Sequence, residues 1–376
     1  MIALSDLVSE LKKNDVNFAA GVPDSLIGQF GAALDAPLSG INHITAVNEG
    51  AAVGLAIGSY LATGKLPVIY MQNSGLGNAL NPLVSLAGSS AFKVPILLLI
   101  GWRGEIGLDG VQIGDEPQHL AQGRITPSLL DQMGIPFLVL DSNSCVSEVV
   151  ALACQTAVQR SLPFAILARK GSFEINTFRQ GSNQREISRR RAIETICDFV
   201  GTRIPVIATT GMISRELFDV RRSLGQPPAD LLCVGGMGHA ISIASGFASM
   251  SSGPVLLLDG DGAAQMHLGA QLTAASIPNL IHVVLNNSAH ASVGGQKTSA
   301  PHLNFSELAP HLGYENSFQA NSEVEIRGSI AAVLSRDTSS LIEVKCALAA
   351  TPELGRPVDH PSINAQLFKQ KASIPQ

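Results

Sequence analysis

The sequence predicts an α/β protein made of two doubly wound parallel-sheet domains, and three observations lead to this prediction. Short apolar runs of strand length alternate with helix-like stretches along most of the 376-residue chain. Hydrophobic residues make up 45% of the chain and charged residues only 15%, as expected when strands are buried on both faces. Gly is abundant, at 36 residues, while aromatic residues are scarce at 5%, which favours parallel α/β packing over a β-sandwich.

Eleven apolar runs are the expected strands of the two domains. Those in the first half are residues 16–22, 41–47, 66–73, 94–101, 135–140 and 163–169, with helix-like stretches between them such as 50–64 and 78–92. Those in the second half are residues 204–211, 230–236, 253–260, 280–287 and 339–348. Because alternating strands and helices build parallel sheets with helices on both faces, each half is expected to form its own sheet.

A polar stretch separates the two halves. The alternation lapses between about residues 174 and 190, so we expect one domain over 1–178, a linker over 179–190 and a second domain over 191–376. We interpret the basic cluster Arg185–Arg191 as a solvated linker and helix start. Residues 1–14 have the pattern of an amphipathic helix, and the tail beyond about Pro352 favours no particular element.

Composition argues against several classes of function. The net charge of −5 lacks the basic surplus of a nucleic-acid-binding protein. The apolar runs are of strand length and too short to cross a bilayer, and residues 1–14 lack the basic and apolar regions of a signal peptide. The 5 cysteines are scattered with no C-x-x-C pair, which fits reduced thiols. We therefore expect a cytoplasmic protein with neither nucleic-acid nor membrane partners.

Two polar motifs follow predicted strands in the second half. Gly260-Asp261-Gly262 ends the run 253–260, and Asn286-Asn287 ends the run 280–287. The carboxyl ends of parallel strands meet at the sheet edge where ligands bind. An Asp carboxylate and an Asn amide oxygen are suitable Mg²⁺ ligands when a diphosphate supplies further oxygens, and flanking glycines let the backbone approach phosphate. A GDG triplet alone is common in turns, so its distance to the Asn pair carries the prediction.

This spacing resembles the diphosphate-binding signature of thiamine-diphosphate enzymes. The resemblance implies thiamine diphosphate and Mg²⁺ as cofactors, with the metal held by Asp261, Asn287 and the main-chain carbonyl of Ala289. It also implies further cofactor contacts, from Gly260, Gly262, Ala263, Thr210 and Gly211.

Two other segments look like parts of the same cofactor site. Asn48-Glu49 leads from a strand into a small-residue helix, which resembles the pyrimidine-binding motif whose glutamate hydrogen-bonds the aminopyrimidine ring. Gly235-Gly236-Met237-Gly238 resembles the turn in which an apolar residue supports the bent cofactor, so Met237 would be the support and Gly235 the carbonyl acceptor. Taken alone, Glu49 could be a helix-start carboxylate favoured by the helix dipole, and Met237 could be a core residue of a glycine-rich turn.

Along essentially its whole length the chain is similar to the phosphonopyruvate decarboxylase family, and it has no room for the middle domain of most thiamine-diphosphate decarboxylases. The matching segments are residues 21–30, 101–105, 115–119, 209–218, 235–240, 260–270, 286–296 and 354–357. The resemblance implies decarboxylation of 3-phosphonopyruvate to phosphonoacetaldehyde and CO₂ in phosphonate biosynthesis. The alternatives are a sulfopyruvate decarboxylase, a related carboligase and, from another class, a non-catalytic diphosphate-binding regulatory protein. A nicotinamide oxidoreductase fits worse, because no G-x-G-x-x-G follows the first strand.

Six side chains are candidates for proton transfer or substrate binding. Asp24, His119 and His290 are the candidate proton handlers, although Asp24 could be a turn residue and either histidine a packing residue. A phosphonate dianion needs donors, and the candidates are Ser25, Arg103 and Lys297. Arg103 could instead belong to a structural ion pair.

The resemblance also implies an oligomer. The two cofactor-binding halves of such enzymes meet across subunits, so Glu49 of one chain should complete a site whose Asp261 belongs to another. We therefore expect a homodimer or a higher homo-oligomer.

Overall fold

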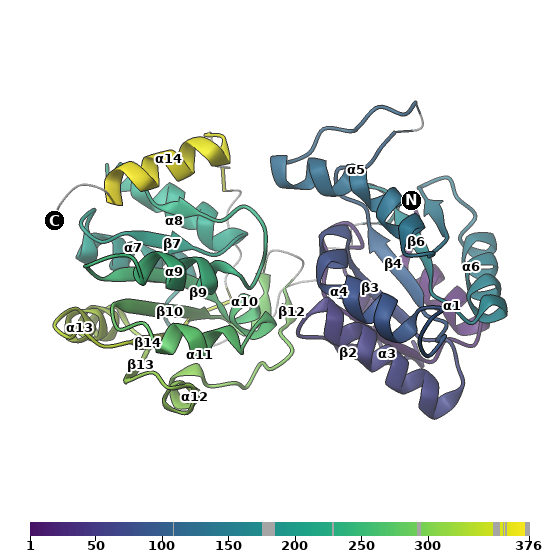
Figure 1. Cartoon of the computed structure of the whole chain (residues 1–376), viewed down its shortest axis with the longest axis horizontal. Helices are drawn as coiled ribbons and strands as arrows, with labels where there is room; N and C mark the ends of the chain where they lie inside the picture. The colour runs from purple at the N-terminus through teal and green to yellow at the C-terminus, as the bar shows by residue number, and fades with distance from the viewer. Residues whose placement is uncertain are drawn as a thin grey trace. The chain divides into compact units, whose positions relative to one another are not determined.

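The computed structural model describes residues 1–107, 109–174, 185–227, 229–291, 295–348, 354–355, 357 and 359–372. The chain divides into two compact units, Met1–Phe178 and Arg179–Gln376. Each unit contains one six-stranded sheet with helices packed against it (Figure 1).

The sheet of the first unit is parallel throughout and confirms the six strands predicted for this half. Its strands lie in the order β2-β1-β3-β4-β6-β5. Their bounds are β1 (Phe18–Gly21), β2 (Asn42–Thr45), β3 (Val68–Gln72), β4 (Leu97–Gly101), β5 (Phe137–Leu140) and β6 (Phe164–Ala168). β2 was added on one side of β1 and β3 on the other, so the order of strand addition reverses between β1 and β3. The loops after these two strands therefore border a topological switch point of the sheet.

Helices cover both faces of this sheet, as a doubly wound fold requires. They are α1 (Leu4–Lys13), α2 (Phe30–Leu34), α3 (Glu49–Thr63), α4 (Leu76–Pro82), α5 (Pro117–Gln132) and α6 (Val146–Arg160), with a 3₁₀ turn at Asn73–Gly75 and a π turn at Leu83–Ala87. On β3, Val68 and Tyr70 join a core cluster with α1, α2 and α6, while Ile69 and Met71 join another with α3, α4 and α5. Successive side chains of a strand point to opposite faces, so a continuous apolar run fills both cores.

The second unit repeats this strand arrangement. Its sheet has the order β13-β14-β10-β9-β7-β8 and is also parallel. The bounds are β7 (Val206–Ala208), β8 (Leu231–Leu232), β9 (Val255–Gly260), β10 (Leu280–Asn286), β13 (Asn316–Ala320) and β14 (Ser340–Lys345). Numbered from one to six along the chain, the strands of both sheets lie in the order 2-1-3-4-6-5. A separate antiparallel hairpin joins β11 (Ala289–His290) to β12 (Gln296–Lys297).

One strand of this sheet, β13, was not predicted. It lies at the sheet edge, and only Ala320 of its five residues is buried. An edge strand pairs on one side only and needs no continuous apolar run, so its sequence lacked the signal that identified the central strands.

Helices again form two layers. They are α7 (Arg189–Val200), α8 (Met212–Ser223), α9 (Ala240–Ala248), α10 (Asp261–Met266), α11 (Ala270–Ala275), α12 (Phe305–Leu312), α13 (Glu323–Leu334) and α14 (Pro361–Ala372). One core cluster joins the sheet to α7, α8 and α13, and the other joins it to α9, α12 and α14. The fold class predicted from sequence is therefore confirmed in both units.

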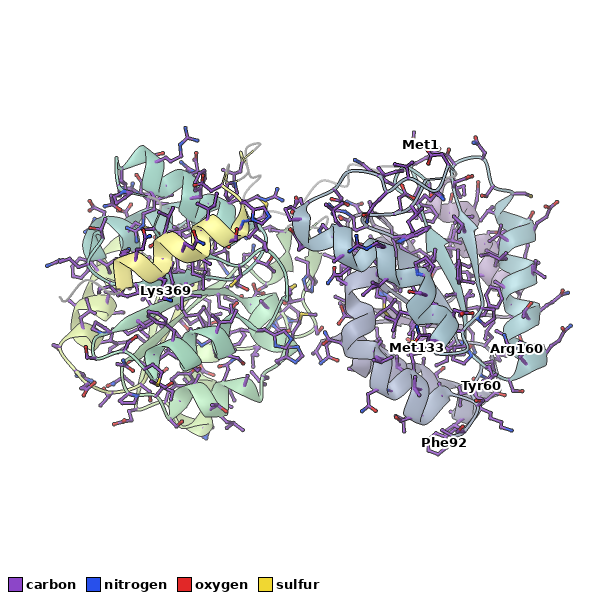
Figure 2. The ribbon with its side chains drawn as sticks, turned by 45° about the horizontal axis from the view of Figure 1, so that its top comes forward. Met1, Tyr60, Phe92, Met133, Arg160 and Lys369 are labelled. Atoms are coloured by element: carbon purple, nitrogen blue, oxygen red, sulfur yellow. The ribbon has the colours of Figure 1, made fainter. Side chains whose placement is uncertain are left out.

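The C-terminal helix α14 covers the edge strand β8. Figure 2 shows it, with Lys369 labelled, lying across the second unit. Its Asn364 accepts a hydrogen bond from Leu232 N at 3.0 Å and donates to Asp230 O at 2.8 Å, while Phe368 is buried in the core. These side-chain bonds satisfy backbone groups that an edge strand would otherwise leave to solvent.

The interpretation of the arginine cluster as a helix start is confirmed, whereas its interpretation as solvated is wrong for Arg189, whose side chain is only 11% exposed. α7 begins at Arg189, inside the predicted linker, and Arg189 makes a two-pronged ion pair with the buried carboxylate of Glu216 at 2.7 and 3.0 Å. Arg190 pairs with Asp219 at 2.5 Å. Side chains of this cluster thus attach α7 to the α8 helix that packs beside it.

Candidate active site

In the first unit, the loops after β1, β3 and β4 meet around the carboxyl group of Asp24, which is only 2% exposed. Its Oδ2 accepts hydrogen bonds from Leu26 N at 3.0 Å and Ile27 N at 3.1 Å, and its Oδ1 accepts one from Gln72 Nε2 at 2.9 Å. Burial outweighs these bonds and raises the pKa of Asp24. A Cβ at Gly101 would lie 2.0 Å from Oδ2, so the carboxyl fits only because β4 ends in glycine.

Arg103, Asp115 and His119 lie beside this carboxyl. Arg103 makes a two-pronged ion pair with Asp115, with Nε at 2.7 Å and Nη2 at 2.5 Å, and its Nη1 donates to Ser25 Oγ at 3.4 Å. Burial alone would raise the pKa of Asp115, but the hydrogen bonds from Arg103 hold it below its usual range. Burial, and then the charge of Arg103, lower the pKa of His119, and its buried Nδ1 has no hydrogen-bond partner in the described part of the chain.

The backbone that carries Arg103 is held by Asn73, which sequence reasoning missed. Asn73 Nδ2 donates to Arg103 O and to Thr126 Oγ1, both at 3.0 Å, and Asn73 Oδ1 accepts from Arg103 N at 3.1 Å. The available signal was its position as the last residue of the strand-like run 66–73, the same kind of position that identified the Asn pair at 286–287.

Glu49 is the first residue of α3 and is 6% exposed. The helix start is fixed by Asn48, whose side chain caps Ala51 N at 2.8 Å. Glu49 Oε2 accepts a hydrogen bond from Asn78 Nδ2 at 2.8 Å. A Cβ at Gly75 would lie 2.5 Å from both Cγ and Oε1 of Glu49, so the carboxyl is closely packed. Asn78 is a second contact that sequence reasoning missed.

In the second unit, Asp261 and Asn287 follow the neighbouring strands β9 and β10. The register pairs Gly260 with Leu285, which brings the two strand ends side by side. Asp261 is 3% exposed and Asn287 5%. Burial raises the pKa of Asp261 to about 6. Thr298 Oγ1 donates to Asp261 Oδ2 at 3.2 Å, and Asn287 Oδ1 accepts from Ala289 N at 3.1 Å.

Thr298 is a contact of Asp261 that the motifs did not reveal. The hairpin pairs Ala289 with Lys297 and so returns the chain to the strand ends, where Thr298 N bonds to Ser288 O at 3.3 Å. Thr298 is buried, whereas the predicted substrate residue Lys297 is exposed. The only local signal was the proximity of Thr298 to the Asn pair in the sequence.

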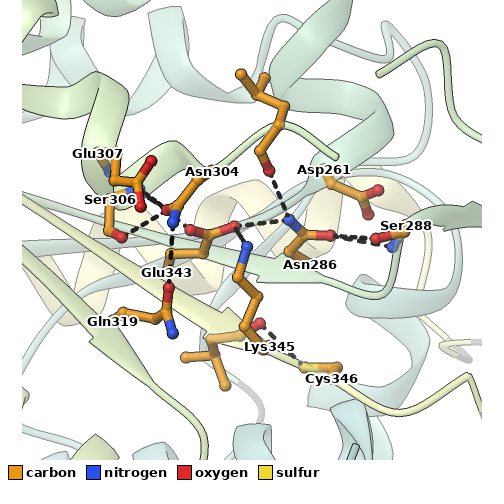
Figure 3. A network of polar contacts seen from close by, with 12 residues as sticks. Asp261, Asn286, Ser288, Asn304, Ser306, Glu307, Gln319, Glu343, Lys345 and Cys346 are labelled. Atoms are coloured by element: carbon orange, nitrogen blue, oxygen red, sulfur yellow. Dashed lines mark hydrogen bonds and ion pairs between the residues drawn. The ribbon is translucent and has the colours of Figure 1, made fainter. Parts of the chain in front are cut away.

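Asn286 belongs to a network of polar contacts, which Figure 3 shows. Its Nδ2 donates to the buried carboxylate of Glu343 at 2.6 Å, and its Oδ1 accepts from Ser288 N at 3.0 Å and Ser288 Oγ at 3.2 Å. Glu343 also accepts from Lys345 Nζ at 2.6 Å and Ser306 N at 3.1 Å. Asn286 therefore shapes the turn that carries Asn287.

Met237 and His290 both pack against Gly262. A Cβ at Gly262 would lie 3.0 Å from His290 Cε1 and 3.5 Å from Met237 Cε. The turn before α9 requires glycine at 238, where φ is +87° and an added Cβ would approach Met266 Cβ at 2.8 Å. Burial lowers the pKa of His290 to about 4, which favours the neutral ring at neutral pH, and its Nε2 has no partner among the described residues.

The other predicted cofactor residues lie at the same ends of the strands. Thr210 and Gly211 follow β7, Gly235 follows β8, Gly260 ends β9, and Ala263 is in the first turn of α10. The residues predicted for the diphosphate side thus lie at or just after the carboxyl ends of the strands of one sheet.

The donors at this edge fit Mg²⁺ together with a diphosphate. Within the ranges that the structure describes, no three His, Cys, Asp or Glu side chains gather closely enough to hold a metal ion. The available donors are the Asp261 carboxylate, the Asn287 amide oxygen and main-chain carbonyls, all hard oxygen ligands. Such a sparse protein set suits Mg²⁺ when phosphate oxygens complete the octahedron. An added Cβ at Gly260 would lie 3.2 Å from Ile213 Cδ1, so here, as at Gly262, neighbouring side chains already occupy the space beside the glycine.

Comparison with known proteins matches both units to one family. The family described as "Thiamine pyrophosphate enzyme, N-terminal TPP binding domain" matches residues 2–135, and "Thiamine pyrophosphate enzyme, C-terminal TPP binding domain" matches residues 211–344. A helix both long and apolar enough to cross a membrane is not found in the described ranges.

Curated relatives match over the full chain. Phosphonopyruvate decarboxylase of Streptomyces viridochromogenes is 30% identical, with 100% of this chain and 96% of the relative covered. The enzyme of the same name from Streptomyces hygroscopicus is also 30% identical, over 100% and 95%. Sulfopyruvate decarboxylase of Methanosarcina acetivorans is 27% identical over 84% of each chain. The chain therefore belongs to the thiamine-diphosphate-dependent decarboxylases, a family of carbon–carbon lyases that includes phosphonopyruvate decarboxylase.

Proposed function

We propose that this protein decarboxylates 3-phosphonopyruvate to phosphonoacetaldehyde and CO₂, using thiamine diphosphate and Mg²⁺, as a step of phosphonate biosynthesis. The observation that carries the proposal is that one chain holds both parts of such a site: the buried carboxyl of Glu49 at a helix start, and the Asp261 and Asn287 oxygens at two adjacent strand ends. A protein that only bound a diphosphate would need the second part alone.

The cofactor side divides into residues that bind and a residue that activates. Bound thiamine diphosphate supplies the nucleophilic carbon and the electron sink for decarboxylation. Asp261, Asn287 and the Ala289 carbonyl would hold Mg²⁺, and Met237 would support the thiazolium ring. Glu49 would hydrogen-bond the ring nitrogen N1′ and share a proton with it. Its helix-start position and its bond from Asn78 keep the carboxyl in one place.

Asp24 and His119 are the residues proposed to move substrate protons. Burial raises the pKa of Asp24, so the carboxyl keeps its proton to a higher pH than an exposed Asp and can act as an acid. The lowered pKa of His119 leaves its ring neutral and able to accept a proton. Arg103 and Ser25 lie beside Asp24 and would face the phosphonate, with Arg103 oriented by Asp115. His290 and Lys297 remain further candidates for these two roles.

Cofactor titration followed by substrate assays tests the proposal. Apo-protein would be titrated with thiamine diphosphate with and without Mg²⁺, and CO₂ release would then be measured with phosphonopyruvate, sulfopyruvate and pyruvate. We expect Mg²⁺-dependent binding and the highest kcat/KM with phosphonopyruvate. Binding without any turnover would favour a regulatory protein, and the absence of Mg²⁺-dependent binding would overturn the whole assignment.

Sulfopyruvate is the second candidate substrate. The observation that favours it is the 27% identity to a sulfopyruvate decarboxylase of similar length. Both substrates carry an anionic group on the carbon next to the keto group, so the same donors could bind either. A higher kcat/KM with sulfopyruvate would select this alternative.

The proposal includes a homodimer or larger homo-oligomer in which Glu49 and Asp261 of one site come from different chains. Mixing Glu49→Gln chains with Asp261→Ala chains should then restore part of the activity that each variant lacks. If activity stays absent after subunit exchange has been verified, each site is built from a single chain. A cytoplasmic location is also proposed, in keeping with five cysteines that carry free thiols.

A further inference from the structure

Arg185 lies four residues before α7 and reaches into the turn that follows β10. Its Nη1 donates to Asn286 O at 2.5 Å and to Cys346 O at 3.1 Å, and its Nη2 donates to Ser288 Oγ at 3.0 Å. The side chain is part-buried. One guanidinium therefore joins the residues on both sides of Asn287 to the end of β14.

The point at which β10 and β14 diverge explains why an arginine is suited to this place. β10 and β14 remain paired as far as Asn286 and Lys345, and Cys346 N then donates to Asn286 O at 2.8 Å. The planar guanidinium can bridge the diverging carbonyls because its donors point in fixed directions. An isolated parallel β-bridge pairs Ser188 with Ala347. The segment that follows Arg185 therefore lies beside the segment that follows β14.

The turn needs such support because its backbone is strained at Ser288, where φ is +61°. Asn286 Oδ1 holds Ser288 N and Oγ from inside the turn, and Arg185 holds Asn286 O and Ser288 Oγ from outside it. Asn287 lies between these two residues. Its own side chain accepts a bond from Ala289 N at Oδ1, at 3.1 Å, and the backbone that carries it is held by the bonds of its two neighbours.

We propose that Arg185 is a positioning residue for the Mg²⁺ and diphosphate site, acting through the turn at residues 286–288. The inference rests on the proposed function, and it assigns a role at that site to a segment outside both matched regions, 2–135 and 211–344. Groups that orient metal ligands typically change metal affinity about 10- to 100-fold when they are removed. If Arg185 only stabilised the fold, its removal would lower the free energy of unfolding and leave metal affinity unaltered.

Metal binding measured without turnover separates these two roles. Free Mn²⁺ would be followed by electron paramagnetic resonance while the full-length protein is titrated in the presence of thiamine diphosphate. Arg185→Gln is expected to weaken Mn²⁺ binding about tenfold or more. Arg185→Lys should weaken it less, since an ammonium keeps the charge but lacks the planar donors that bridge two carbonyls. The matched control is Arg191→Gln, which removes an arginine of the same basic segment that pairs with Glu323 at 2.7 Å on the exposed surface.

Each outcome decides the proposal. Mn²⁺ affinity within twofold of the wild type in a folded Arg185→Gln protein overturns it, as does equal weakening in Arg191→Gln. If Arg185→Gln does not fold, judged by its circular dichroism melt without metal, Arg185→Lys decides by the same twofold criterion. A wild-type protein that binds no Mn²⁺ with thiamine diphosphate would overturn the proposed function and this inference together, whereas normal wild-type binding with unaffected variants overturns the inference alone.

Discussion

Replacing Gly75 by alanine should impair catalysis by displacing the carboxyl of Glu49. Gly75 has φ −70° and ψ −14°, a conformation that alanine adopts without strain, so the backbone tolerates the change. The new Cβ, however, would lie 2.5 Å from both Cγ and Oε1 of Glu49, whereas ordinary contacts begin near 3.4 Å. The carboxyl must therefore move by roughly 1 Å, which also strains its 2.8 Å hydrogen bond from Asn78.

The expected loss follows from this displacement. A misplacement of about 1 Å can cost on the order of 10²-fold in rate, which corresponds to about 2.7 kcal/mol in the activation barrier. Cofactor affinity should change much less, because the proposed Mg²⁺ and diphosphate contacts belong to residues of the second unit. The measurement is kcat/KM for decarboxylation of phosphonopyruvate, together with the dissociation constant of thiamine diphosphate and the melting temperature.

Gly77→Ala is the matched control for this change. Gly77 is an exposed residue of α4 two positions further on, and an added Cβ there meets no atom within 4 Å. Alanine is favoured over glycine inside a helix by up to about 1 kcal/mol, so this variant should be at least as stable as the wild type and fully active. If Gly75→Ala keeps kcat/KM within about threefold of the wild type, the close packing around Glu49 has no catalytic importance and the reasoning is refuted.

Three further predictions concern the carboxyl groups. Glu49→Gln should leave thiamine diphosphate affinity within about threefold of the wild type. It should slow exchange of the cofactor C2 proton in deuterium oxide by roughly 10²-fold or more, in the range attributed to general acid–base catalysis. Equal losses in affinity and exchange rate would assign Glu49 to binding. Asp261→Ala, like removal of Mg²⁺ with EDTA, should abolish metal-dependent cofactor binding in a calorimetric titration, and readdition of Mg²⁺ should rescue only the wild type. Burial raises the pKa of Asp24 above 3.8, so the folded state binds the carboxyl proton more tightly than the unfolded state does. The stability that this proton contributes is lost as pH rises through the folded-state pKa. The melting temperature of Asp24→Asn minus that of the wild type should therefore increase between about pH 4 and pH 7, and a constant difference would contradict the buried setting of this carboxyl.

The strands that bear the site could be predicted from sequence because they are buried on both faces. β9 is apolar up to Asp259, and β10 is apolar apart from its last residue and the buried His282. Asp261 and Asn287 directly follow these strands, so they are recognisable from the order of residues alone. Thr298 is not recognisable in this way, since it reaches Asp261 only because a hairpin reverses the chain. Register between strands and the path of a loop are long-range properties that residue patterns within one segment do not encode.

The arginine cluster shows why local charge patterns mislead. A run of basic residues next to a polar stretch has the composition of a solvated segment. Arg191 has a local partner, Glu194, three residues further on. The other partners lie far along the chain: Glu216 is 27 residues from Arg189, and Glu323 is 132 residues from Arg191. Arg185 bonds mostly to main-chain carbonyls, which any residue could provide. No spacing rule within the segment could have identified these long-range contacts.

The repeated strand order explains how two dissimilar sequences can both build parts of a cofactor site. In each unit the first strand lies beside the third and the third beside the fourth, so the loops after these strands meet at one edge. In the first unit these loops bring together Asp24 and Arg103, groups suited to proton transfer and anion binding. In the second unit they carry Asp261 and Asn287, groups suited to a metal. The sheet determines where polar groups gather, and the loop residues determine which chemistry is possible there. Exchanging loop residues between the units should therefore change the chemistry of an edge without changing its fold.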